Sequence, residues 1–147
     1  MSDFIQKEVI DCQLADVFET VADPKNAAKI FLNVEEVEAQ NEKERQVGAS
    51  YREYRQLTNR RVGTDIEITC YDRNQAYCFK SLSKGLHVEY CYTFSEAEDG
   101  KTNVRFEGTV YPEKWILKLA KPLLVKMLKK EDQNHLTYVK RYMEGTE

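Results

Sequence analysis

Apolar and polar residues alternate with a period of two over much of the chain between residues 34 and 111. The clearest stretch is VGTDIEITC at residues 62–70, where Val, Thr, Ile, Ile and Cys alternate with Gly, Asp, Glu and Thr. Such a period is typical of β-strands whose two faces have different surroundings. Together with a weaker stretch near the start of the chain, the pattern predicts strands at residues 4–12, 34–39, 47–57, 62–70, 76–81, 87–94 and 102–111.

Short polar turns separate these strands, around Asn59–Arg61, Asn74, Lys84-Gly85 and Gly100. Turns this tight join antiparallel neighbours. If they are the centres of hairpins, one apolar face is formed by cross-strand pairs, and the previous strand adds Tyr77 and Phe79 to it. The predicted pairs are Val88 with Val110, Tyr90 with Gly108, Tyr92 with Phe106, and Phe94 with Val104.

Helical spacing replaces the alternation in two places. After the first strand, Leu14, Val17, Phe18 and Val21 predict a short helix that Asp23-Pro24 closes, and a second short helix follows at about residues 25–31.

The stretch from residue 115 to residue 143 is the longest helical pattern in the chain. Pro122 belongs in a first turn, which predicts a lead-in turn at residues 115–120 and a main helix from about Lys121 to Met143, stopped by Gly145. One stripe of this helix carries Glu131 and His135 among apolar residues, which are Leu124, Leu128, Val139 and Tyr142, with Leu136 and Met143 on its shoulder. This helix should cover the apolar face of the sheet.

Composition limits the class of protein. The 147 residues suit a single domain, residues 1–147, and the net charge of −3 gives no general attraction for nucleic acid. No apolar run is long enough to span a membrane, and the first residues do not resemble a signal peptide. The four cysteines lack the spacing of a disulfide scaffold or zinc site, so we expect reduced thiols in a cytoplasmic protein.

The element order and several short stretches resemble the helix-grip superfamily SRPBCC. These stretches are DVFETVADPKN, Val47-Gly48 leading into SYREY, TCYDRNQAYCF and TFSEAEDGKTNVRFEG. The superfamily includes START lipid-transfer domains, birch-pollen-allergen-like proteins and the polyketide cyclase/dehydrase family. The resemblance implies an α+β fold in which a curved antiparallel sheet of six to seven strands wraps on a long C-terminal helix, with two short helices after the first strand. Arg73 stands where many members carry Pro, and Ile30-Phe31 stands where many carry Trp; because the Trp side chain is absent, the ligand class does not carry over.

The resemblance also implies a cavity between the sheet and the last helix. We expect it to hold a small hydrophobic or amphipathic ligand, for transport or sequestration, and to be lined by Tyr77, Tyr90, Tyr92, Phe106, Leu124, Leu128, Glu131 and His135. A dry core made of the same aromatic residues is the alternative.

Two other functions stay open. In the first, Glu131 and His135 serve as acid and base of a cyclase- or dehydratase-type enzyme; in the second, the chain is an interaction module like the chaperone-activating members of the superfamily. Binding without catalysis is the preferred interpretation. We expect no cofactor, no metal, no nucleic-acid partner, no stable membrane insertion, and a monomer or weak homodimer.

Two further features have simpler interpretations. Cys70, Cys78 and Cys91 would form a row across three strands, with Cys78 and Cys91 on the face away from Tyr90 and Tyr92. A flat row does not supply tetrahedral metal ligands. The lysines of the last helix should form a solvated outer face, since the sheet should cover its apolar side; they are Lys114, Lys118, Lys121, Lys126, Lys129 and Lys130.

Overall fold

Seven antiparallel strands form one open sheet in the computed structural model, which describes residues 2–56, 59–83, 86–112 and 114–145, except the side chains of Ser83, Ile116, Leu117 and Glu131. Leu57 and the predicted turn at Lys84-Gly85 lie outside the described residues. The sheet order is β1-β7-β6-β5-β4-β3-β2. The strands are β1 (Phe4–Ile10), β2 (Val34–Ala39), β3 (Ser50–Gln56), β4 (Arg61–Asp72), β5 (Ala76–Ser83), β6 (Leu86–Glu96) and β7 (Thr102–Pro112).

The strand register predicted from the turns is confirmed. Val88, Tyr90, Tyr92 and Phe94 of β6 lie opposite the four predicted residues of β7, and Tyr77 of β5 lies opposite Tyr92. Because side chains alternate between the faces of a strand, these rings share the concave face. A β-bulge between Ile68 and Cys70 shifts the register of β4 against β5.

Gly108 of β7 provides space for a ring from the neighbouring strand. Phe4 of β1 pairs with Gly108, and a Cβ at that position would lie 2.1 Å from Phe4 Cζ. The Phe4 side chain is buried and packs near Tyr90 and Phe106, with ring centroids 6.3 Å and 6.4 Å away. The missing side chain of Gly108 therefore lets Phe4 complete the aromatic face.

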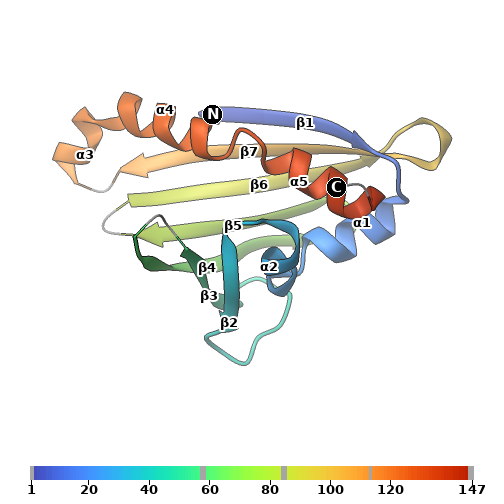
Figure 1. The fold of residues 1–147 in the computed structure, drawn as a ribbon, viewed down its shortest axis with the longest axis horizontal. Helices are drawn as coiled ribbons and strands as arrows, with labels where there is room; N and C mark the ends of the chain where they lie inside the picture. Colours follow the sequence, from blue (N-terminus) through green and yellow to red (C-terminus); the bar gives the residue numbers. More distant parts are fainter. Residues whose placement is uncertain (1, 57–58, 84–85, 113, 146–147) are drawn as a thin grey trace.

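Helices from both ends of the chain cover this face of the sheet (Figure 1). After β1 come α1 (Leu14–Val21), the 3₁₀ turn η1 (Pro24–Asn26) and α2 (Ala27–Ile30), and a second 3₁₀ turn, η2 (Glu98–Gly100), joins β6 to β7. The C-terminal part forms α3 (Trp115–Leu119), α4 (Lys121–Glu131) and α5 (His135–Glu144). Val17 and Phe18 of α1 and Leu136 and Val139 of α5 are at most 2% exposed, so α1 and α5 seal the core at one end of the sheet.

The predicted main helix from Lys121 to Met143 is interrupted at residues 132–134. The side chain of Gln6 in β1 bridges the interruption. Its amide nitrogen donates to the Asp132 carbonyl, and its Oε1 accepts from the Leu136 N–H at 3.2 Å. Helix ends leave such backbone groups without partners inside the helix, so Gln6 stabilises two separate helices. Tyr142, which was expected on the covered stripe, is 42% exposed near the end of α5.

The cysteine row is present, but two of its thiols are oxidised. Cys70 lies opposite Cys78, and Cys78 lies opposite Cys91. Cys78 and Cys91 form a disulfide with Cα atoms 4.1 Å apart, whereas Cys12 and Cys70 are free. The expectation of four reduced thiols is therefore wrong in this structure. The β5–β6 register expected from the sequence already placed Cys78 opposite Cys91, but it did not indicate that the two are bonded.

We predict that Gly108→Ala destabilises the protein by about 1–3 kcal/mol, because the new methyl group overlaps the Phe4 ring. In a Phe4→Ala background the same change should be neutral or stabilising, since alanine is better than glycine in a strand. Urea unfolding of the four proteins in this double-mutant cycle measures the coupling. Equal costs in the two backgrounds would contradict the assigned contact.

We predict that alkylation in denaturant without reductant modifies two cysteines, Cys12 and Cys70, and that prior reduction exposes all four. Cells are quenched in acid before alkylation, and intact mass spectrometry of the protein isolated from them gives the number of alkylated cysteines. A Cys78→Ser control should show three alkylated residues with or without reductant. Four alkylated residues in unreduced wild-type protein would restore the reduced state expected from the sequence.

Candidate ligand-binding site

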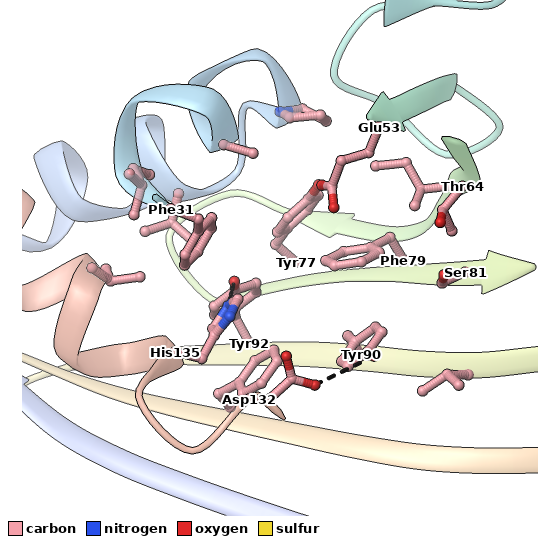
Figure 2. A pocket seen from close by; sticks show the side chains of 18 of the residues that line it. Phe31, Glu53, Thr64, Tyr77, Phe79, Ser81, Tyr90, Tyr92, Asp132 and His135 are labelled. Atoms are coloured by element: carbon pink, nitrogen blue, oxygen red, sulfur yellow. Dashed lines mark hydrogen bonds between the residues drawn. The ribbon is translucent and has the colours of Figure 1, made fainter. Parts of the chain in front are cut away.

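A cavity of about 250 Å³ lies between the concave face of the sheet and the helices that cover it. This volume is just below the range of about 300–1,000 Å³ that is usual for ligand pockets. Strands β3 to β7, the η1–α2 segment, α4 and α5 all contribute to its wall, part of which Figure 2 shows. The lining residues are Val21, Asp23, Pro24, Ala27, Ile30, Phe31, Glu53, Arg55, Thr64, Ile66, Tyr77, Phe79, Ser81, Leu86, Val88, Tyr90, Tyr92, Phe106, Leu128, Asp132, His135 and Val139.

Aromatic rings from three adjacent strands form the floor. Tyr77 and Tyr92 stack with ring centroids 5.8 Å apart, and Tyr90 stacks on Phe106 at 5.6 Å. Phe79 lies 5.3 Å from Tyr90. Burial raises the pKa of the Tyr77 and Tyr92 phenols well above the ordinary value, so both stay neutral near pH 7. The floor is therefore broad and apolar, with a few hydroxyl groups.

His135 is enclosed at the first turn of α5. Its ring stacks on Phe31 at 4.3 Å and on Phe106 at 4.1 Å, and two parallel partners at this spacing must lie on opposite faces of the imidazole. Its Nε2 shares a hydrogen bond with the Tyr92 hydroxyl (Figure 2). Burial, followed by the Arg55 charge, lowers the pKa of His135 from 6.5 to about 3. At neutral pH the imidazole is uncharged.

Four charged residues line the cavity: Asp23 at the start of η1, Glu53 and Arg55 on β3, and Asp132 beside His135 at the helix break. Glu53 is 9% exposed, and its Oε1 accepts from Arg55 Nε at 2.7 Å. Burial opposes the Arg55 charge, but the carboxylates of Glu53 and Asp132 outweigh it and raise the pKa of Arg55. Asp132 is 8% exposed, and the Tyr90 hydroxyl donates to its Oδ2 at 3.5 Å. Partners of this kind allow charges to remain in a mostly apolar cavity.

Six of the eight residues predicted to bind the ligand line the cavity: Tyr77, Tyr90, Tyr92, Phe106, Leu128 and His135. Leu124 is half-buried but is not part of the lining. Glu131 is the last residue of α4, and its side chain lies outside the described part of the structure. Since the helix is interrupted after Glu131, the regular one-turn spacing of Glu131 and His135 on a continuous helix does not apply.

The charged lining residues Glu53 and Arg55 were missed in the sequence. The sequence did carry a signal: Tyr51, Glu53 and Arg55 are alternate residues of the strand SYREYRQ, so their side chains lie on the same face. Because Tyr51 is buried, the other two also face inward. Asp132 reaches the cavity because it stands at the helix break, which the apolar pattern did not indicate. Among the described residues, no three His, Cys, Asp or Glu side chains are grouped to hold a metal ion.

We predict that His135 makes the protein less stable in acid. The folded pKa of about 3 lies below the unfolded value of 6.5, so the unfolded chain binds a proton first as the pH falls. Between these values stability should fall by about 1.4 kcal/mol per pH unit, and the loss should level off below pH 3.

Urea unfolding from pH 8 to pH 3 checks this, with His135→Gln as the variant that cannot titrate. His87→Gln removes the only other histidine and is the control. The His135 variant should have the flatter pH profile, and identical profiles for the two variants would contradict the assignment.

Known proteins resemble this chain over nearly its whole length. Residues 1–144 match the model of the family described as polyketide cyclase/dehydrase and lipid transport. No curated protein matches by sequence.

Three solved structures share the fold. A START superfamily protein from Mycobacterium smegmatis has a TM-score of 0.78 at 8% identity, with 97% of each chain covered. The protein Ara h 8.0201 has a TM-score of 0.73 at 13% identity, again with 97% of each chain covered. The di-domain ARO/CYC protein BexL from the BE-7585A biosynthetic pathway has a TM-score of 0.71 at 12% identity, covering 96% of this chain and 46% of that one.

The helix-grip fold expected from the sequence is thus confirmed, and with it the SRPBCC resemblance. The chain belongs to the polyketide cyclase/dehydrase and lipid transport family.

Proposed function

We propose that the protein binds a small hydrophobic or amphipathic molecule in this cavity, for transport or sequestration. The observation that carries the proposal is the makeup of the wall, a broad aromatic floor with a few charged residues, which are Asp23, Glu53, Arg55 and Asp132. Ligand sites combine apolar walls with a few placed polar groups, and a fully packed core would leave no such space.

The polar groups of the wall favour an amphipathic ligand. Arg55, Glu53 and Asp132 offer both a donor and acceptors, whereas Tyr77, Phe79 and Tyr90 offer flat apolar surface. A molecule with an apolar body and one polar end would bury its body on the rings and direct its hydroxyl or carbonyl group to the charged residues. The family description, which includes lipid transport, agrees with such a ligand.

Cyclase- or dehydratase-type catalysis is the second candidate. The family description and the ARO/CYC neighbour favour it, as does a neutral imidazole at the cavity wall that can take part in proton transfer. His135 is held between two rings and bonded to Tyr92, an arrangement that fits a positioned structural group better than a mobile acid or base. Binding without chemistry therefore ranks first, with Glu131 and His135 as the proposed pair if a reaction occurs.

A cytoplasmic location is part of this proposal. No described helix has the length and apolar content needed to cross a membrane. The Cys78–Cys91 disulfide bears on the location, because disulfides are rare in a reducing cytosol. The alkylation count described for the fold therefore tests this point too.

We predict that Ser81→Phe weakens binding of the neutral dye N-phenyl-1-naphthylamine at least about tenfold, a change of about 1.4 kcal/mol. Ser81 lines the cavity from β5, so a phenyl group there would occupy the ligand space. Fluorescence titration of the purified protein measures the affinity.

Leu82→Phe is the matched control, because Leu82 is the next residue of the same strand, is 41% exposed and is not part of the lining. Thermal melts should show both variants folded. Wild-type affinity in folded Ser81→Phe protein would rule out this cavity as the dye site.

A further inference from the structure

Four large apolar side chains on α3 and α4 point away from the core. Trp115, Leu119, Leu123 and Met127 are 70%, 75%, 70% and 54% exposed. Trp115 and Leu119 lie four residues apart on α3, and Leu123 and Met127 lie four residues apart on α4, so each pair shares one side of its helix and the four form an exposed apolar row. Single exposed leucines are ordinary, but a row of four including the only tryptophan of the chain marks an interaction surface.

The same segment is strongly basic. Residues 114–130 contain six lysines and no acidic residue, in a chain whose net charge is −3. Lys121 lies near Asp3, with Nζ 3.5 Å from Oδ1. The other five lysines are exposed, and within the described part of the chain none of them forms an ion pair. The segment is therefore a positive strip on a molecule whose remainder is acidic.

Five of the six lysines are exposed, as expected for a solvated outer face, but exposed apolar side chains lie among them. That expectation assumed that the sheet covers the apolar side of the helix. Only part of α4 is covered: Leu128 lines the cavity, whereas the adjacent Met127 is exposed. The helix is apolar on more than one side, so it has apolar surface left after it covers the sheet.

We propose that the α3–α4 segment docks the protein onto an anionic lipid bilayer. A helix that presents exposed apolar side chains among lysines lies in the interfacial plane of such a membrane, and tryptophan favours the interface. Lysine side chains can extend their ammonium groups to lipid phosphates while their methylene groups lie along the apolar row. The two helices form one end of the upper edge in Figure 1, clear of α1 and α2, so a flat surface can approach them.

An anionic bilayer fits this strip better than a protein partner. The lysines follow the whole row instead of gathering at one place, which suits a surface of uniform negative charge. Docking would be peripheral, since no described helix can span a membrane. The inference does not depend on a ligand in the cavity, although Leu128 would place the cavity wall directly behind the docked face.

The test uses large unilamellar vesicles of phosphatidylcholine with about 30% phosphatidylserine, and vesicles of phosphatidylcholine alone. Trp115 is the single tryptophan, so its emission reports on this surface. We expect a blue shift and co-sedimentation with the anionic vesicles only, both weakened as the salt concentration rises.

The variant Leu119→Ser/Leu123→Ser/Met127→Ser should bind anionic vesicles at least tenfold more weakly while keeping its melting temperature. Leu32→Ser/Leu82→Ser is the matched control, because both leucines are exposed elsewhere, at 87% and 41%, and it should bind like wild type.

Three results would overturn the proposal. These are no binding to anionic vesicles, equal binding to both kinds of vesicle, and wild-type binding by the triple variant. A dimer seen by size-exclusion chromatography that the triple variant abolishes, without vesicle binding, would assign the surface to a second copy of the chain instead.

Discussion

The concave aromatic face of the sheet must be covered, and the helices cover its two ends unequally. At one end α1 and α5 place Val17, Phe18, Leu136 and Val139 against the strands so closely that these side chains are at most 2% exposed. At the other end Leu128 of α4 is only half-buried, and the rings beneath it border the cavity. Burial of apolar area stabilises the first end, while incomplete packing leaves room at the second. Fold and candidate site therefore depend on the same surface.

The break between α4 and α5 allows this division. An uninterrupted helix would present one stripe to the sheet along its whole length. Gln6 satisfies the backbone groups at the break. The two helices can therefore pack separately, and α5 places its apolar residues in the core. Asp132 stands at the break and lines the cavity, where its charge acts on Arg55.

Neighbouring protein groups stabilise the charged side chains of the cavity wall. The Glu53–Arg55 pair and Asp132 keep their partners within the wall, whereas His135 avoids the cost of burial by remaining neutral. His135 and the carboxylates thus have different parts in the structure. The imidazole fills a stack of rings, and the charged residues supply polar groups to a largely aromatic cavity.

The alternation of apolar residues and the short turns were sufficient to predict the seven strands, the pairing of β6 with β7, the row of cysteines and most of the aromatic cavity wall. These features depend on local periodicity, which survives in the sequence because each side chain's face follows from its position in the strand. The helix break, the disulfide and the exposed row on α3 and α4 were decided by tertiary structure, whereas the parity of strand β3 already indicated the inward charges of Glu53 and Arg55. The helix break depends on a contact between segments far apart in the chain, Gln6 with Asp132, and periodicity within one segment carries no information about its partner.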